Sequence, residues 1–531
     1  MNITRCILGF TFFFATTVLA AEYKTEVFIP GYGFHAIHGI AADADGMLYV
    51  GSVVGQSIYK VDPKTGESSV WAKAPLGMAD DIEIGPDGQF YWTSFMLGKV
   101  HTRLKDGTVK ELATDLPGMN SIALKQDGRL FATQVFSADA LHEIDPTGEK
   151  PARKIMENMG GLNGFDFGPD GRLYGPIWFK GQVAAVDVDT AKLTVIAEGF
   201  EVPAAVNFNS KGELFAVDSA RGEVIQIDIE TGAKTLIAKT KTGIDNLCFD
   251  AEDNLYITIM SESAIHEVNV EDGTTRTVKE GSFAFPADIA IDGNTLYLAD
   301  TFSNRTVDLT TKESVSIARF PEHAHEYSNG IAISDKFIHS ASFFNSAVQT
   351  LDRKTGEILT TYHELITPFD VAEMPDGRLL ALQMMSGSIV ELKSETERET
   401  VFGGLTTPVA MVVVDANQLY VTEYASGNVS LINLDTGAKT IIATELEGPE
   451  GIALGPDGLL YVAETAAQRV TVIYPRTGGK TVIAENLPIG YKTAPGMPPM
   501  GITTGVAVAD NGDVYVTSDI EDALYRIRKV K

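Results

Sequence analysis

Acidic and amide residues recur at one place in a repeated pattern, directly before a short apolar strand. In the second half of the chain, this place is held by Asp288, Asn329, Asp370, Ala410, Glu450 and Thr504. Carboxylate and amide oxygens are the ligands that Ca²⁺ prefers, and it takes about six to eight of them. If the positions converge, their carboxylates repel one another unless a cation neutralises them. Asp288, Asn329, Asp370 and Glu450 are therefore predicted to hold a divalent cation, with Ca²⁺ as the first choice. Another divalent cation stays open, as does a simpler role in which each residue caps a strand start.

The equivalent positions of the first half carry a different set of residues. They are His38, Asp81 with its neighbour Asp80, Asn120, Asn163, Ala204 and Asp245. Together with His35, the acidic residues and His38 form either a different site or a degenerate one.

Two histidines interrupt the repeat in the stretch EHAHE. His323 and His325 lie in residues 317–328, an irregular segment that is expected on the same face as the strand heads. Histidine titrates near neutral pH, so each is a candidate general base, and Asp370 is the alternative proton acceptor. A zinc site is the weaker interpretation of this spacing. Cys248, which lies in an apolar strand, is expected to be a buried hydrophobic residue.

The elements that position these residues are hairpins with a recurring turn. Residues 449–465 read PEGIALGPDGLLYVAET, in which two apolar strands flank a Pro-Asp-Gly turn. Pro presets φ, Asp bonds to its own backbone and Gly adopts positive φ, so the turn is locally encoded. The hairpin recurs twelve times and is usually followed by a third and a fourth strand. A period of about 40 to 50 residues with four strands predicts β-propeller blades.

Twelve blades exceed the usual size of one ring, which is about four to eight. The sequence therefore predicts an all-β chain of two tandem six-bladed propellers, spanning residues 21–271 and 272–531. In this prediction, residues 23–30 close the first ring and residues 274–279 close the second. The rival arrangement pairs both chain termini in one ring and inserts the other ring as a unit. In either case the heads of the inner strands face the central channel, where the candidate residues converge.

Composition limits the partners. The formal net charge is −29, from 71 acidic and 42 basic residues. Such a field disfavours nucleic acid and anionic membranes, and is compatible with a neutral small-molecule substrate or a cation. Residues 1–20 read as a signal peptide, with Arg5 before an apolar stretch that ends in Val-Leu-Ala. We expect a secreted or periplasmic protein that has no membrane contact after removal of the signal; a retained anchor is the alternative. The sequence indicates no oligomeric state.

Short motifs give a resemblance. SNGIAIS at residues 328–334, PFDVAEMPDG at 368–377, PEGIALGPDG at 449–458 and PADIAI around Asp288 resemble the SMP-30/gluconolactonase/LRE-like family. That family contains six-bladed, calcium-dependent lactonases. The resemblance implies that Asp288, Asn329, Asp370 and Glu450 hold the metal, with Asp288 standing where the family has Asn. The general hairpin pattern is also similar to NHL-repeat proteins and streptogramin lyases.

The resemblance implies a secreted, metal-dependent hydrolase of a lactone or related ester. The cation would polarise the carbonyl and activate a water, and Asp370, His323 or His325 would take the proton. Two alternatives stay open. One is a C–O lyase similar to streptogramin lyases, with His323 or His325 as the base; the other is a non-catalytic binding scaffold of the NHL type.

Overall fold

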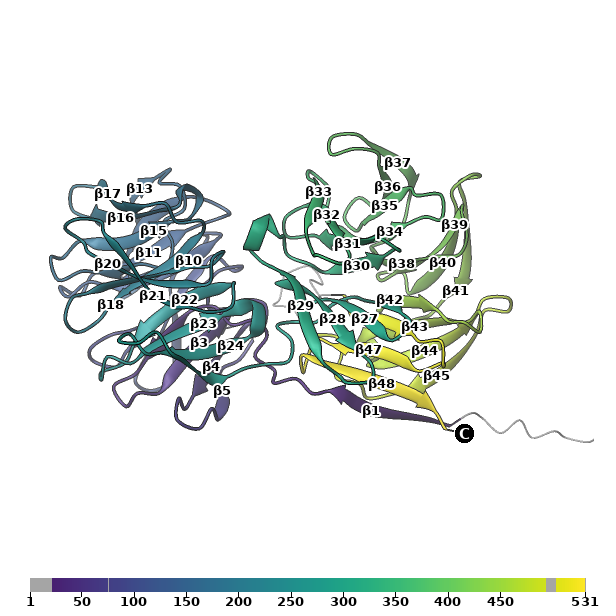
Figure 1. Ribbon diagram of the computed structural model, residues 1–531, viewed down its shortest axis with the longest axis horizontal. Coiled ribbons are helices and arrows are strands. Elements are labelled where there is room, and N and C mark those ends of the chain that lie inside the picture. The colour runs from purple at the N-terminus through teal and green to yellow at the C-terminus, as the bar shows by residue number, and fades with distance from the viewer. Residues whose placement is uncertain (1–21, 75, 493–502, 531) are drawn as a thin grey trace, which may run out of the picture.

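The computed structural model describes residues 22–74, 76–492 and 503–530, and these form an all-β protein. Twelve four-stranded antiparallel sheets make up two six-bladed propellers, which lie side by side (Figure 1). The predicted fold class is thus confirmed. Among the described residues, no helix is long and apolar enough to cross a membrane. The predicted signal peptide, residues 1–20, lies outside the described residues.

The first propeller contains blades 1 to 6. Blades 1 to 3 are β2 Ile40–Ala42, β3 Leu48–Ser52, β4 Ser57–Val61 and β5 Ser68–Ala72; β6 Ile82–Ile84, β7 Phe90–Ser94, β8 Lys99–Arg103 and β9 Val109–Ala113; and β10 Met119–Leu124, β11 Leu130–Gln134, β12 Ala140–Ile144 and β13 Arg153–Glu157. Blades 4 to 6 are β14 Asp166–Phe167, β15 Leu173–Ile177, β16 Gln182–Asp187 and β17 Lys192–Glu198; β18 Pro203–Phe208, β19 Leu214–Asp218, β20 Glu223–Ile227 and β21 Lys234–Lys239; and β22 Ile244–Phe249, β23 Leu255–Ile259, β24 Ala264–Val268 and β25 Thr275–Lys279. Short 3₁₀ turns η1 Trp178–Lys180 and η2 Met260–Glu262 lie in blades 4 and 6.

The second propeller contains blades 7 to 12. Blades 7 to 9 are β26 Ile289–Asp292, β27 Thr295–Ala299, β28 Ser303–Asp308 and β29 Ser314–Arg319; β30 Gly330–Ile333, β31 Phe337–Ser342, β32 Ala347–Asp352 and β33 Ile358–Tyr362; and β34 Pro368–Glu373, β35 Leu379–Gln383, β36 Ser388–Leu392 and β37 Arg398–Gly403. Blades 10 to 12 are β38 Pro408–Val413, β39 Gln418–Glu423, β40 Asn428–Asn433 and β41 Ala438–Ala443; β42 Pro449–Leu454, β43 Leu460–Glu464, β44 Arg469–Tyr474 and β45 Gly479–Ala484; and β46 Val506–Val508, β47 Val514–Ser518 and β48 Ala523–Lys529 with β1 Tyr23–Ile29. The turns η3 Glu322–Ala324 and η4 Thr465–Ala467 lie in blades 7 and 11.

The Pro-Asp-Gly turn works as the sequence predicts. In blade 11, the Asp457 carboxylate accepts a hydrogen bond from the Leu459 amide at 3.1 Å, and Gly458 has a φ of 74°. The Gly455 amide then donates to the Leu459 carbonyl at 2.9 Å and closes the hairpin. Local chemistry therefore fixes the turn between the first two strands of this blade.

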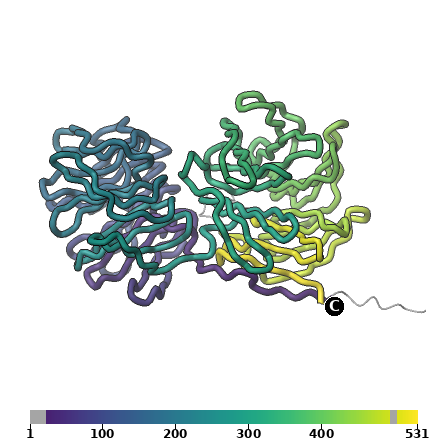
Figure 2. Tube along the Cα trace, viewed as in Figure 1, coloured from purple at the N-terminus to yellow at the C-terminus, as the bar shows by residue number. Residues whose placement is uncertain are grey.

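Ring closure differs from the tandem prediction. Strand β1 pairs with β48, with Glu26 opposite Arg526, so both chain termini lie in blade 12 of the second propeller. Glu26 binds Arg526 and also Arg528, whose guanidinium is 2.8 Å from its carboxylate. Strand β25 pairs with β24 and completes blade 6, so it does not close the second ring. The first propeller is thus inserted between β1 and β26, as in the rival arrangement, and the chain crosses between the rings twice (Figure 2).

The propellers contact each other through an ionic group and an apolar cluster. Arg305 of β28 is buried and binds Asp300 at 2.6 Å, the Ser261 carbonyl at 2.7 Å and Glu262 of the first propeller at 3.1 Å. The apolar cluster joins Ala36 and Met260 of the first propeller to Ala284, Phe302 and Phe320 of the second. These contacts hold the two rings against each other.

Candidate active site

The channel of the second propeller contains only part of the predicted metal site. A cavity of about 310 Å³ runs along its inner strands, and its polar lining includes Asp288 and Asp370. Burial raises the pKa of Asp288 to about 7. Burial, and then the charge of Asp288, raise the pKa of Asp370 well above its usual range. The two carboxylates therefore lie close enough to influence each other.

The predicted carboxylates bind backbone amides of the next blade. Asp288 accepts a hydrogen bond from the Ile331 amide at 3.1 Å, and Asp370 accepts one from the Met411 amide at 2.7 Å. Glu450 accepts one from the Thr504 amide at 2.9 Å. Each acid thus connects its own blade to the following one, as in the strand-capping alternative.

Asn329 and Glu450 do not join the pair in the channel. The Asn329 side-chain oxygen accepts a hydrogen bond from the Phe343 amide at 2.8 Å, and its nitrogen donates to the Phe369 carbonyl at 2.9 Å. Glu450 also binds the Thr465 hydroxyl at 2.9 Å. Across the part of the chain that the structure describes, no three His, Cys, Asp or Glu side chains are grouped to hold a metal ion. The structure sets Asp288 and Asp370 along one cavity and gives Asn329 and Glu450 hydrogen-bond partners of their own, and the calcium site at these four residues stays a prediction.

The predicted catalytic histidines lie apart from Asp370. The His323 side chain is 85% exposed at the tip of η3. His325 is buried, which lowers its pKa to about 4. Neither residue lines the channel cavity that contains Asp370. The structure therefore does not bring the three predicted catalytic residues together.

The alternative group in the first propeller does come together. The Nδ1 atom of His38 lies 3.4 Å from the Asp245 carboxylate and 4.0 Å from that of Asp80. These side chains come from the heads of blades 1, 6 and 2, which neighbour one another around the ring. Asp81 instead accepts hydrogen bonds from the Ile122 amide and the Asn246 side chain, both at 3.1 Å, and plays the capping role seen in the second ring. His38, Asp80 and Asp245 are hereafter called the His38 cluster.

The electrostatics of the His38 cluster suit proton transfer. Burial alone lowers the pKa of His38, but the hydrogen bond and charge of Asp245 and the charge of Asp80 outweigh it and raise that pKa above its usual value. Burial raises the pKa of Asp80 to about 7. His38 is only 7% exposed, and its Nε2 has no hydrogen-bond partner among the described residues. Because Nδ1 faces two carboxylates, it carries the ring proton of the neutral form, and Nε2 holds the free lone pair.

The second propeller covers the His38 cluster with aromatic rings. The Phe302 ring lies 5.6 Å from that of His38, and Tyr327 is stacked on Phe320 at 4.4 Å. Burial, and then the charges of Asp245 and Asp80, raise the pKa of Tyr327. The site is therefore composite, with its titratable groups on one ring and its aromatic cover on the other. In the sequence, the broken period at residues 317–328 was the only signal for Tyr327.

His35 is separate from the His38 cluster. Its Nδ1 lies 2.6 Å from the Asp522 carboxylate of blade 12. This pair joins the linker that enters the first propeller to the second propeller. His35 thus takes part in a contact between the propellers, whereas the sequence analysis grouped it with the candidate site residues of the first half.

A family comparison matches residues 88–299 to the SMP-30/gluconolactonase/LRE-like model. The match shows that this part of the chain is similar to that family. This region runs from blade 2 to the first hairpin of blade 7 and includes Asp245 and Asp288. The predicted resemblance is confirmed, but it covers mainly the first propeller, whereas the motifs at residues 328–334, 368–377 and 449–458 lie outside it. A second match, to the N-terminal model of strictosidine synthase-like proteins, spans residues 436–464.

Other comparisons show similarity in fold only. No curated protein matches the chain. A virginiamycin B lyase from Staphylococcus aureus is 16% identical, over 52% of this chain and 96% of its own, with a TM-score of 0.39. A streptogramin B lyase is 11% identical, over 62% of this chain and 93% of its own, with a TM-score of 0.34. Likenesses this weak do not bear on activity.

Proposed function

We propose that the protein hydrolyses a lactone or related ester, with the His38 cluster as its reacting groups. The observation that carries the proposal is the buried, unpartnered Nε2 of His38, on an imidazole oriented by Asp245. The SMP-30/gluconolactonase/LRE-like region supports it, because that region covers most of the same ring. The substrate would be a small molecule, and the predicted signal peptide would place the reaction in a secreted or periplasmic compartment.

In the proposed reaction, the His38 Nε2 takes a proton from a water molecule, and the oxygen of that water bonds to the substrate carbonyl carbon. The ester C–O bond then breaks, and the leaving oxygen receives a proton. Asp80 is suited to supply that proton, since its pKa of about 7 leaves it partly protonated at neutral pH. Asp245, whose carboxylate lies 3.4 Å from Nδ1, stabilises the imidazolium that forms. The proposal assigns its steps to the residues of the His38 cluster, and calcium dependence is tested separately with a chelator.

The test compares His38→Gln, Asp245→Asn and the control His323→Gln on para-nitrophenyl acetate and simple lactones. Loss of a general base costs about 10²- to 10⁴-fold in rate, so we expect kcat/KM to fall at least about 100-fold for His38→Gln. His323→Gln alters an exposed side chain and should keep the wild-type rate. Full activity in His38→Gln would refute the proposal, and a loss in His323→Gln would favour the irregular segment instead.

The pH profile and the products separate the remaining alternatives. Wild-type activity should rise with pH through a midpoint above the usual histidine value, since His38 must be neutral to act as a base. Asp245→Asn should lower that midpoint. Hydrolysis makes the products heavier by one water, whereas ring-opening elimination leaves the mass unchanged and would indicate a lyase. Measuring hydrolysis of the same substrates with and without a chelator tests whether any cation is required.

A further inference from the structure

We infer that the substrate carries an extended apolar group, which binds an aromatic surface built from both propellers. This inference deepens the proposed function and rests on it for the reaction. The surface has a first wall in the first propeller, Phe95, Phe136, Trp178 and Phe179, and a second wall in the second propeller, Tyr327, Phe343 and Phe344. Its bound group would be the apolar body of a neutral ester or lactone.

The first wall is centred on Phe136. The Phe136 ring lies 5.5 Å from that of Trp178, 5.7 Å from that of Phe179 and 6.2 Å from that of Phe95. These contacts are edge-to-face, an arrangement that aromatic pairs favour. Nevertheless Phe136 is 50% exposed and Phe179 is exposed as well. Three blades thus present their aromatic residues to a common surface without burying them.

The backbone holds Phe136 in an unfavourable conformation. Its φ is +67°, and the Ser137 amide donates to the Val135 carbonyl at 2.8 Å, which makes Phe136 the centre of a tight turn. Positive φ is uncommon for a bulky residue and concentrates at functional sites. Gly118 packs beneath this turn, where an added Cβ would stand 2.5 Å from the Val135 carbonyl oxygen. The fold therefore holds Phe136 in a strained backbone conformation, and the half-exposed side chain gains too little packing to offset that strain.

The second wall extends from the irregular segment of blade 7. The Phe344 ring lies 5.5 Å from that of Tyr327 and 4.0 Å from that of Phe343. Phe343 is stacked on Phe369 at 5.1 Å, which anchors it to the core, whereas Phe344 is 38% exposed. The outer ring of this wall is thus open to a ligand.

The two walls meet beside the His38 cluster. Trp178 of the first wall and Tyr327 of the second pack against one apolar cluster that contains Phe302. The Phe302 ring is 5.6 Å from His38. A continuous set of packed aromatic rings therefore joins the exposed Phe136 and Phe344 to the ring of His38.

The charges around this junction select against anionic ligands. Asp80 and Asp245 lie beside His38, and Glu326 precedes Tyr327. A carboxylate or phosphate on the substrate would meet three acidic side chains there, and above about pH 7, where Asp80 and Glu326 are mostly ionised, it would be repelled. A neutral molecule with an apolar body and one reactive carbonyl fits both the rings and the charges.

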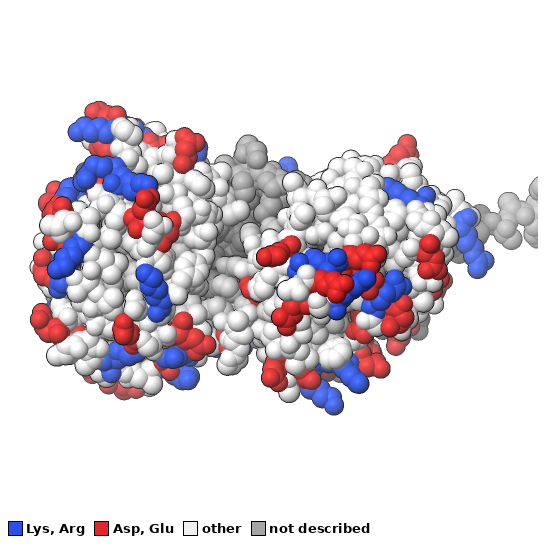
Figure 3. Space-filling view, turned by 90° about the horizontal axis from the view of Figure 1, so that it is seen from above, with Lys and Arg blue, Asp and Glu red and all other residues white. Residues whose placement is uncertain are grey.

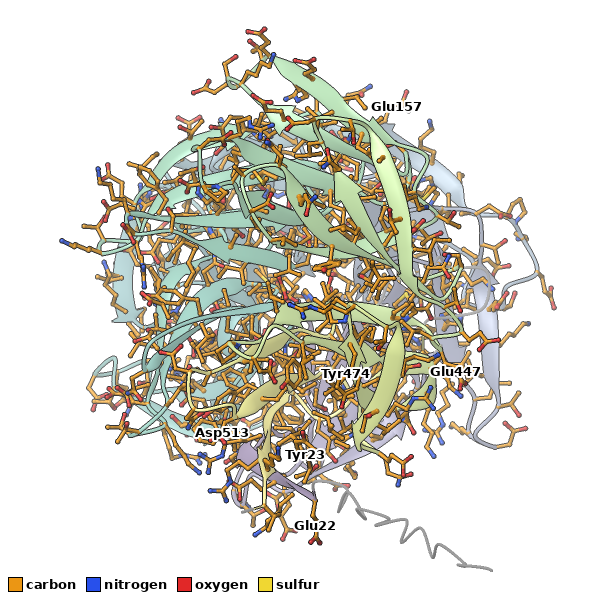
Figure 4. The ribbon with its side chains drawn as sticks, turned by 90° about the vertical axis from the view of Figure 1, so that its right-hand side faces the viewer. Glu22, Tyr23, Glu157, Glu447, Tyr474 and Asp513 are labelled. Atoms are coloured by element: carbon orange, nitrogen blue, oxygen red, sulfur yellow. The ribbon has the colours of Figure 1, made fainter. Side chains whose placement is uncertain are left out.

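The test uses the full chain with Phe136→Ser, Phe344→Ser and the control Tyr474→Ser. Tyr474 is similarly exposed, at 41%, but lies on the side of the second propeller that faces the viewer in Figure 4, away from the first propeller. The first measurement is binding of Nile red, a neutral apolar dye, and it does not depend on catalysis. We expect each wall variant to weaken dye binding about tenfold and Tyr474→Ser to leave it unchanged.

The second measurement is kcat/KM for para-nitrophenyl esters of short and long acyl chains. The wild type should prefer the long chain, both wall variants should lose that preference, and Tyr474→Ser should keep it. If the dye result holds but no ester is hydrolysed, the aromatic surface stands and the proposed function fails. If esters are hydrolysed but the wall variants match Tyr474→Ser in dye binding and chain preference, the inference is overturned.

Discussion

Arg305→Met should loosen the contact between the two propellers, and the structure sets the size of the effect. The buried guanidinium makes hydrogen bonds to Asp300, Glu262 and the Ser261 carbonyl. Bonds to charged groups contribute about 1.5 to 3 kcal/mol each, so their complete loss would cost roughly 5 to 9 kcal/mol. The actual cost is smaller. Asp300 keeps the amides of Ala284 and Phe285, and Glu262 keeps other cations. We expect a loss of about 3 to 5 kcal/mol, the usual range for a broken buried pair.

The cost should depend on pH in a stated direction. Burial already raises the pKa of Asp300 to about 6, and removal of Arg305 raises it further. Below that pKa, Asp300 is neutral and no longer an unpaired charge, so the variant should lose less stability near pH 6 than near pH 8. Burial raises the pKa of Glu262, but Arg305, Lys241 and Arg319 outweigh it and hold that pKa at about 2. In the variant, Lys241 and Arg319 still lie beside Glu262 and oppose the effect of its burial, so Asp300 is the group expected to set the pH dependence.

The assay is urea unfolding followed by circular dichroism and by tryptophan fluorescence. All three tryptophans, Trp71, Trp92 and Trp178, lie in the first propeller, so fluorescence reports that ring and circular dichroism reports both. The matched control is Arg276→Met, which removes a surface pair with Glu267 that should contribute at most about 1 kcal/mol. If Arg305→Met destabilises the protein no more than Arg276→Met does, the ionic contact does not hold the rings together and the reasoning is refuted.

Three further predictions follow from the same structure. A chain without β1, Tyr23–Ile29, should unfold partly at lower urea by circular dichroism, because β1 completes the second ring. The midpoint by tryptophan fluorescence, which reports the first ring, should stay unchanged. An equal fall in the fluorescence midpoint would contradict the strand pairing. Burial raises the pKa of both Asp288 and Glu450 to about 7, above their unfolded values, so the folded state binds more protons below that pH. The urea midpoint should therefore rise as the pH falls from about 8 to about 5, and added calcium should abolish this trend only if an ion binds these groups. Gly451→Ala should reduce the free energy of unfolding by about 1 to 3 kcal/mol, because its Cβ would clash with the Thr504 carbonyl oxygen of the next blade. Gly403→Ala, which has open space around it, should be neutral, and urea unfolding measures both.

Surface charge shows why net charge alone says little about a binding face. Acidic and basic side chains are interspersed over both propellers in the view from above (Figure 3). No single acidic field covers the face that this view shows, although the whole chain has a net charge of −29. The residues in contact with His38 therefore indicate the kind of ligand better than the net charge of the chain does.

The sequence by itself determined the blades. Turn chemistry of the kind seen at Asp457 and Gly458 acts over a few residues, so the twelve hairpins and their period predicted the all-β propellers correctly. It also placed the candidate residues at the heads of inner strands. The hairpins and the positions of these residues both depend on interactions between residues close in sequence, which can be predicted from a single sequence.

Only the tertiary structure decided how the rings close and which strand heads do chemistry. Glu26 and Arg526 are 500 residues apart, and no local pattern shows that β1 completes blade 12 instead of blade 6. An aspartate at a strand head can bind a cation or cap the next blade, and the choice depends on where that blade's amides point. Asp288 meets such an amide, whereas Asp245 meets His38. The His38 cluster is drawn from three blades and covered by the other propeller, so its formation depends on long-range packing.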